Sequence, residues 1–145
     1  MKIFAFFPFL LLVFMTITAF GSAKQTTVTD LPKAITNYLD THFSGIQIAY
    51  IEVDRNPSGK EYDVHLMDGT ELEFDSKHAI EDISSKTALP ASVIPKTISE
   101  YVEKQYPQTF ILEWSKEGRN RQEVKLSNGL ELIFDLHGKF IRIDD

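Results

Sequence analysis

Two glutamates, Glu71 and Glu73, stand two positions apart in the short stretch ELEF. If this stretch is a β-strand, both side chains point to the same face of the sheet, about 6.5–7 Å apart along the strand. Two carboxylates at that separation suit glycoside hydrolysis, in which one is an acid and the other a base or nucleophile. Alternating acidic residues are also typical of the solvated face of a half-buried strand. We prefer the solvated-face interpretation and keep a hydrolase as an alternative.

The other residue types that perform chemistry form no recognisable site. The four histidines, His42, His65, His78 and His137, have neither the helical spacing of a paired metal site nor an HExxH motif. The chain has no cysteine and no GxSxG motif, so neither a thiol nor an elbow serine is available as a nucleophile. We therefore predict no catalytic residue, no metal and no cofactor.

The stretch DRNPSGKEYDVH, residues 54–65, begins like a calcium-binding loop. Oxygen-bearing side chains fill positions 1, 3 and 5, and Gly59 occupies position 6, where such loops turn sharply. Position 12 is His65, where a calcium loop needs a bidentate glutamate. We interpret the stretch as a long hairpin connection.

An internal repeat sets the architecture around these residues. DGTELEFD, residues 68–75, returns as NGLELIFD, residues 128–135, and LPKAITNYL at 31–39 returns as IPKTISEYV at 94–102. The offset is 63 residues upstream and 60 downstream, so the first copy has three extra residues. They fit into the turn-rich stretch 54–60, where an insertion costs little. A match in fixed order over this length indicates two copies of one structural unit.

Each copy has the pattern of one amphipathic helix followed by four strands. The first helix places Leu31, Ile35, Tyr38, Leu39 and His42 on one face at helical spacing. Ranges 46–54, 62–66, 71–74 and 79–83 then have strand composition or alternation, and 109–116, 122–126, 131–134 and 139–143 repeat them. Between the copies, residues 88–93 predict an additional short turn. Each unit is therefore predicted to be a helix followed by a β-meander.

Asp68-Gly69 and Asn128-Gly129 are strong signals for a tight hairpin. A two-residue loop would place Leu66 opposite Glu71, which mixes apolar and acidic side chains on one face. Pairing Leu66 with Leu72 needs one extra residue in the turn or a bulge beside it. Both copies contain this conflict, so we predict a bulged or three-residue hairpin in each.

The order of these motifs resembles the PepSY-like periplasmic protein family, which is grouped with the β-lactamase-inhibitor-like fold. The residues that carry the likeness are Leu31-Pro32, Phe43-Ser44, Tyr62-x-Val64-x-Leu66 and Asp68-Gly69-x-Glu71-Leu72-x-Phe74-Asp75, with the counterparts Ile94-Pro95, Tyr106-Pro107, Gln122-x-Val124-x-Leu126 and Asn128-Gly129-x-Glu131-Leu132-x-Phe134-Asp135. The resemblance implies an α+β fold of two tandem helix-plus-four-stranded antiparallel meander units, with the helices on one face of the sheet and the other face open. It also implies peptidase inhibition or binding of a protein partner, and it brings no catalytic residue.

The open face is the predicted binding surface. The residues expected to bind there are His65, Met67, Glu71, Glu73, Trp114, Lys125, Glu131 and Ile133. Trp114 is the only tryptophan, and its strand is apolar on both sides, so the indole belongs either to the core or to the surface as an aromatic anchor. The leading hypothesis is an exported, non-catalytic binding module for a protein or peptide. A plain solvated face, a small hydrolase and a passive envelope component that self-associates through a strand edge are the alternatives.

Residues 1–23 have the pattern of a secretory signal peptide, with Lys2 before an apolar run and small residues at 21–23. An uncleaved anchor is the alternative. Cleavage after Ala23 would leave residues 24–145 as one domain of two repeats, about 29–85 and 88–145, with no stable membrane anchor. That chain has 14 basic and 21 acidic residues, a net charge of −7, so nucleic acid and anionic membranes are poor partners. We expect a periplasmic or secreted protein.

Overall fold

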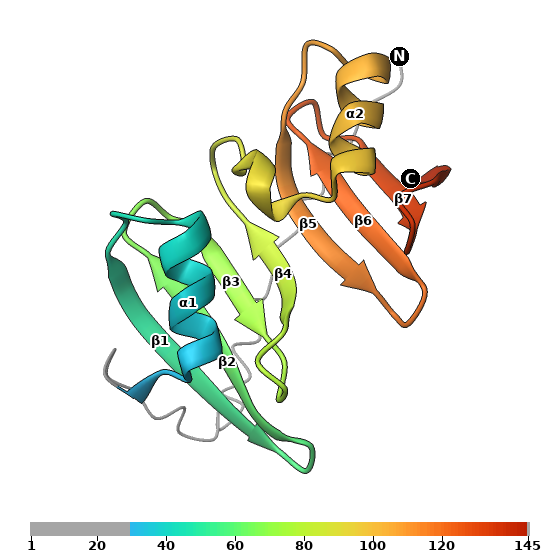
Figure 1. The fold of residues 1–145 in the computed structure, drawn as a ribbon. Helices are drawn as coiled ribbons and strands as arrows, with labels where there is room; N and C mark the ends of the chain where they lie inside the picture. Colours follow the sequence, from blue (N-terminus) through green and yellow to red (C-terminus); the bar gives the residue numbers. More distant parts are fainter. Residues whose placement is uncertain (1–29, 145) are drawn as a thin grey trace, which may run out of the picture.

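The computed structural model describes residues 30–144, so the predicted signal peptide lies outside the described part. The first repeat comprises α1 (Lys33–His42), β1 (Ile48–Asn56), β2 (Gly59–Leu66), β3 (Glu71–Phe74) and β4 (Ile80–Ser84). The second comprises η2 (Ala91–Val93), α2 (Lys96–Gln105), β5 (Ile111–Glu117), β6 (Arg121–Leu126), β7 (Glu131–Asp135) and β8 (Phe140–Asp144). The predicted order of one helix and four strands occurs twice (Figure 1).

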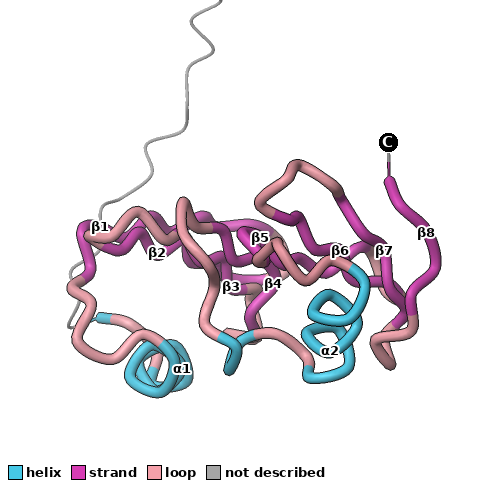
Figure 2. Tube along the Cα trace, turned by 90° about the horizontal axis from the view of Figure 1, so that it is seen from above, coloured by secondary structure: helices cyan, strands magenta, loops and turns pink. Residues whose placement is uncertain are grey.

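The eight strands form one antiparallel sheet in the order of the chain, from β1 at one edge to β8 at the other. The repeats join where β4 pairs with β5, and Ile83 stands opposite Trp114 at this junction. Both helices lie against the same side of the sheet, and no described helix covers the other side (Figures 1 and 2). The predicted α+β fold with an open sheet face is confirmed, whereas the exact repeat limits stay a prediction.

The core lies between the helices and the inner face of the sheet. Ile35 and Leu39 of α1 are buried, as are Ile98 and Val102 of α2, because residues four apart share one face of a helix. They pack over strand residues that are fully enclosed, such as Val64 and Leu72 in the first repeat and Val124 and Leu132 in the second. Each such side chain contributes about 1.5–3 kcal/mol when it leaves water, so the paired apolar positions explain why both units fold alike.

The helices are short, with 10 residues each. The first ends before Gly45, whose φ of 82° only glycine adopts without strain. The second ends before Pro107, which cannot continue the helical hydrogen bonds. Within residues 30–144, no helix has both the length and the apolar character that crossing a membrane requires.

The two predicted irregular hairpins are confirmed. Leu66 donates its N–H to the carbonyl oxygen of Thr70, and the N–H of Gly69 returns to the carbonyl oxygen of Leu66, so the loop has three residues. The second repeat has the same bonds between Leu126, Leu130 and Gly129. Leu72 therefore stands opposite Val64 and Leu66 opposite Thr70, which keeps all four on the inner face although the Leu66–Leu72 pair itself does not form.

Candidate functional site on the open sheet face

A row of acidic side chains crosses the outward face of the sheet at right angles to the strands. We call this the carboxylate row; it consists of Glu52, Asp63, Glu73, Asp82, Ser115 and Glu123, each in cross-strand register with the next. Neighbouring strands are about 4.8 Å apart, and only Ser115 interrupts the run of carboxylates. Like charges directly opposite one another destabilise a sheet, so the row needs another explanation than fold stability.

The proximity of these groups changes their protonation. Partial burial raises the pKa of Asp63 to about 6, and the negative charges of Glu73, Asp54 and Glu52 add to the effect. Asp82 has its pKa raised to about 6 in the same way, first by burial and then by surrounding glutamates. The pKa of Glu123 is also raised, chiefly by burial. A positively charged ligand would counter this repulsion and hold these carboxyls in their ionised form.

His65 lies on the outward face, in the cross-strand row next to the carboxylate row. Its ring stacks on Tyr50 at 4.0 Å between centroids, with 13° between the planes. Its Nδ1 is 3.5 Å from a carboxylate oxygen of Glu71, and its Nε2 is 3.8 Å from one of Glu52. Within the described chain, Nε2 has no hydrogen-bond partner. His65 therefore lies between the carboxylates of Glu52 and Glu71, with the ring of Tyr50 stacked on its own.

On the outward face of the second repeat, acidic side chains form ion pairs with basic side chains of the same repeat. Lys125 lies 3.6 Å from Glu113 and 3.3 Å from Glu131, and its pKa is raised first by the hydrogen bond to Glu131. Arg142 pairs with Asp144 near the C-terminal edge. The unbalanced negative charge is therefore concentrated over β1 to β4, in the first repeat.

Most of the predicted binding residues lie where the sequence places them. His65, Glu71, Glu73, Lys125 and Glu131 are on the outward face, in two adjacent cross-strand rows. Met67 belongs to the β2–β3 turn and is 68% exposed. Whether these residues bind a partner stays a prediction.

Two of the predicted residues are corrected. Trp114 is 6% exposed and belongs to the core cluster on the helix side, so it is not an outward anchor. Its Nε1–H donates to Oε1 of Gln122 at 3.0 Å, which satisfies the indole where it is buried. Ile133 has the outward register but is only 2% exposed, between Glu123 and Arg142 on the neighbouring strands. Long charged side chains cover apolar surface with their stems, so Ile133 is unavailable to a partner.

Four acidic residues of the row were not among the predicted binding residues: Glu52, Asp63, Asp82 and Glu123. Asp63 and Glu123 share the alternation of His65 and Lys125, which already indicated the outward face. Asp82 gives no such signal, because a bulge between β3 and β4 shifts the alternation of its strand. Cross-strand neighbours, in contrast to alternation, are not written in the sequence of one strand.

The calcium-like stretch 54–65 is a hairpin, as interpreted from the sequence. Asn56 ends β1, and its side-chain oxygen accepts the N–H of Ser58 inside the turn. In residues 30–144, no three histidine or acidic side chains are grouped so that they could hold a metal ion.

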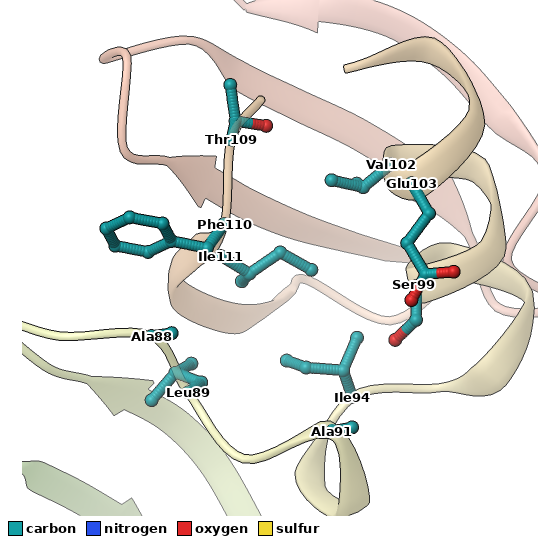
Figure 3. A pocket seen from close by; sticks show the side chains of 10 residues that line it. All are labelled: Ala88, Leu89, Ala91, Ile94, Ser99, Val102, Glu103, Thr109, Phe110 and Ile111. Carbon is teal, nitrogen blue, oxygen red and sulfur yellow. The ribbon is translucent and has the colours of Figure 1, made fainter. Parts of the chain in front are cut away.

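A hollow of about 160 Å³ lies at the junction of the repeats, between η2, α2 and the start of β5. Figure 3 shows Ile94, Val102 and Ile111 directed toward one another there, while the ring of Phe110 points away. Ligand pockets usually have about 300–1,000 Å³. This space is therefore a packing gap between core side chains, and Phe110 remains an exposed apolar group beside it.

A duplicated helix-and-meander unit with one uncovered sheet face defines an α+β protein with an open antiparallel sheet. The family model described as "Putative beta-lactamase-inhibitor-like, PepSY-like" matches residues 21–80 and again residues 60–142. The chain belongs to this family, and the resemblance stated from the motifs is confirmed. None of the curated proteins matches the chain.

Solved structures agree with this assignment. A Bacteroides vulgatus protein described as a "putative periplasmic protein from DUF2874 family" is 34% identical, with a TM-score of 0.77, over 84% of this chain and 96% of its own. A "putative calcium-regulated periplasmic protein" from Bacteroides thetaiotaomicron is 34% identical, with a TM-score of 0.78, over 84% and 96%. A second B. vulgatus protein, described as periplasmic and "of unknown function", is 34% identical, with a TM-score of 0.78, over 86% and 100%. The protein is periplasmic, as expected.

Proposed function

We propose that the protein is a non-catalytic periplasmic binding module whose outward sheet face captures a positively charged, extended segment of a protein or peptide. The carboxylate row supports this proposal most directly. Four strands in succession, β1 to β4, each contribute one of its carboxylates, and no described cation pairs with Asp63, Glu73 or Asp82. A sheet face that opposes like charges in this way gains stability when a cation arrives.

The spacing of the row favours an extended occupant. Four adjacent strands span about 14 Å at 4.8 Å each, and alternate residues of an extended peptide are about 6.5–7 Å apart. Two or three lysine or arginine side chains of one short segment can therefore each reach a carboxylate. The face is open, so such contacts are screened by salt, and we expect an affinity that falls as the ionic strength rises.

The hydrolase alternative receives less support from the same geometry. The Glu71 side chain is 59% exposed on the open face, whereas hydrolytic sites profit from walls that exclude water. Glu73 stands in register between Asp63 and Asp82, which suits the binding of cations, whereas Glu71 stands between His65 and Ser84 and has no second carboxylate opposite it.

Calcium is a competing occupant, because one similar structure is described as calcium-regulated. Carboxylate oxygens are suitable calcium ligands, but a calcium ion is held by six to eight oxygens that converge on one point. The row is linear, and no convergent group of three acids or histidines occurs in residues 30–144. We therefore favour a chain of separate positive charges over one divalent ion.

The test is a titration of the protein with octalysine, octaglutamate and calcium chloride, each followed by calorimetry at two salt concentrations. The informative variant is Glu73→Gln with Asp82→Asn, which removes two adjacent charges of the row. Its matched control is Asp40→Asn with Glu103→Gln, which removes two exposed charges from the helices on the other side. We expect the first variant to bind octalysine about fivefold to tenfold more weakly, since exposed ion pairs contribute up to about 1 kcal/mol each.

Each outcome decides between the candidates. Equal losses in both variants would mean that octalysine responds to net charge, which would contradict a site on the outward face. Calcium binding without octalysine binding would replace the peptide by a metal ion. Failure of all three probes would overturn the proposal.

The pH dependence gives a second test with a defined sign. The pKa of about 6 at Asp63 and Asp82 means that both carboxyls take up protons as the pH falls from 7 to 5. Octalysine binding should therefore weaken over this interval. Its affinity should also depend less on the ionic strength, because fewer ion pairs form. The same titration in the His65→Gln background removes the imidazole from the profile, and an affinity independent of pH in that background would contradict a role for the row.

A further inference from the structure

A second hollow, of about 340 Å³, lies on the helix side of the second repeat. It is bounded by the β5–β6 hairpin, by Pro95 ahead of α2 and by Leu136 in the β7–β8 turn. Trp114 and Gln122 line it from the buried side. Its volume falls at the lower end of the range of ligand sites.

The side chains around the hollow differ from those at the equivalent positions of the first repeat. Tyr62 of the first repeat occupies the position of Gln122, and its buried ring packs edge-on against His78 at 5.7 Å. Val53, which packs against the core, has the place of Lys116. The second repeat thus has an amide and a long flexible cation beside Trp114, where the first repeat has a ring and an apolar branch beside Ile51.

Three cations surround this space in a chain whose net charge is negative. Lys116, Arg119 and Arg121 all line the hollow. Within residues 30–144, none of the three has an ion pair or a side-chain hydrogen bond. The concentration of free positive charge is a feature that the acidic composition of the protein does not predict.

The nearby carboxylates do not neutralise this group. Glu117 stands opposite Arg121 across the hairpin in the same outward register, and within residues 30–144 no ion pair joins the two. Asp135 also stands opposite Arg121, and its carboxylate already accepts the N–H groups of His137 and Lys139. The second bond is one of the contacts that hold the pKa of Asp135 below its ordinary value.

The floor of the hollow offers apolar surface, since its polar atoms are already satisfied. The indole N–H of Trp114 donates to Oε1 of Gln122, and Nε2 of Gln122 donates to the carbonyl oxygen of Asp135, both at 3.0 Å. Pro95 and the 55% exposed Leu136 supply apolar walls. Cations at the mouth and apolar groups within describe a complementary ligand with one negative and one apolar end.

We propose that this hollow binds an organic carboxylate that carries an adjoining apolar or aromatic group. Arginine guanidinium groups hold a carboxylate through paired, charge-assisted hydrogen bonds, and the apolar group would lie on Trp114 between Pro95 and Leu136. A free small acid and the C-terminal residue of a peptide share this chemistry. The site is separate from the outward face, so it stands or falls independently of the function proposed above.

Trp114 makes the site measurable, because it is the only tryptophan and it lines the hollow. Intrinsic tryptophan fluorescence and calorimetry should be followed during titration with 3-phenylpropionate, its amide, N-acetylphenylalanine and N-acetylphenylalaninamide. We expect both acids to shift the tryptophan emission and both amides to bind at least tenfold more weakly. Preference for 3-phenylpropionate would point to a free acid, and preference for N-acetylphenylalanine would point to a peptide C-terminus.

The variant Arg119→Gln with Arg121→Gln should weaken acid binding by tenfold or more, since it removes the charge-assisted hydrogen bonds to the carboxylate. Arg55→Gln with Lys60→Gln is the matched control, because it removes the same charge from the corresponding hairpin of the first repeat. Lys116→Met keeps the alkyl stem and serves as a second variant if the double substitution perturbs folding. Amides that bind as well as acids, equal losses in the control hairpin, or no binding of any probe would each overturn the site. Octalysine binding should be unchanged both in the variant Arg119→Gln with Arg121→Gln and in the control variant Arg55→Gln with Lys60→Gln.

Discussion

The two repeats share one backbone plan and differ on both faces of the sheet. On the outward face, carboxylates of the first repeat oppose one another, whereas Lys125 and Arg142 pair with acids in the second. On the helix side, Ile51 and Tyr62 of the first repeat hold the positions of Trp114 and Gln122, which line a hollow in the second. The positions that bury apolar side chains remain equivalent, so the fold is preserved while the surfaces acquire opposite charge preferences. Stability and recognition are carried by different residues of the same strands.

Exchanging the residues of the two equivalent turns has the largest expected effect. His78 and Gly138 occupy the same left-handed position, with φ of 65° and 79°. A side chain at position 138 would collide with Thr97 and meet Ile98 of α2. Gly138→His should therefore lower the free energy of unfolding by about 3–4 kcal/mol, through overpacking and left-handed strain. Urea unfolding followed by circular dichroism measures this loss.

The reverse exchange sharpens the comparison. His78→Gly removes left-handed strain but also the ring contact with Tyr62, so we expect a change below about 1 kcal/mol. Equal losses from the two exchanges would show that the turns have the same surroundings, against the difference described above.

Importing the core residues of the first repeat into the second should cost nearly as much. Ile51 holds the position of Trp114, as shown by their pairing with Val64 and Val124. Trp114→Ile would remove a buried ring and leave Gln122 without its donor, so we expect a loss of about 3 kcal/mol.

Adding Gln122→Tyr restores the pair found in the first repeat. The double variant should be about 1–2 kcal/mol more stable than the sum of the single losses, since contacting residues are coupled. A double-mutant cycle in urea measures the coupling, and strict additivity would contradict a shared packing space.

Where the repeats are alike, they should respond alike. Gly69 and Gly129 have φ of 87° and 89° in their three-residue hairpins. Alanine at either position should lower the free energy of unfolding by about 1–2 kcal/mol, because both hairpins need a left-handed residue there. Thermal and urea unfolding of the two variants should agree within about 0.5 kcal/mol. A large difference would break the equivalence of the two backbones.

A small gain in stability is expected when one charge is removed from the carboxylate row. Burial and neighbouring acids raise the pKa of Asp82 to about 6 from an ordinary value of 3.8. The folded state then binds more protons than the unfolded state between these values, so the wild-type stability falls as the pH rises through the interval. Asp82→Asn should stabilise the protein by about 1 kcal/mol at pH 7, after allowance for solvent screening. The gain should disappear near pH 4.

The control for this effect is Glu103→Gln, an exposed acid on α2. It should leave the free energy of unfolding almost unchanged between pH 4 and pH 7. A pH-independent gain in Asp82→Asn would mean that charge repulsion in the row is not its cause.

Local patterns predicted much of the fold. The repeat, the alternation in β2, β3 and β6, and the glycine of each hairpin are all readable along single segments, and the parity conflict at Leu66 correctly required a third loop residue. The side occupied by Trp114 could not be read, because Phe110 to Trp114 is apolar on both sides. The buried state of Ile133 and the alignment of Asp63, Glu73 and Asp82 depend on neighbours from other strands. The hollow beside Trp114 is lined by residues from three separate segments of the chain, so no single segment predicts it.

The pairing of β4 with β5 has a consequence for the integrity of the molecule. Ile83 and Trp114 stand opposite each other where the two strands pair. Beyond the strands, the N–H groups of Ser85 and Leu89 donate to the carbonyl oxygens of Leu112 and Ile111. Cleavage of the chain between β4 and η2, followed by separation of the two repeats, would expose the edges of β4 and β5. It would also bring the side chains of Ile83 and Trp114 into contact with water. Each repeat provides the strand that pairs with the edge strand of the other. We therefore expect the two repeats to unfold in one cooperative transition.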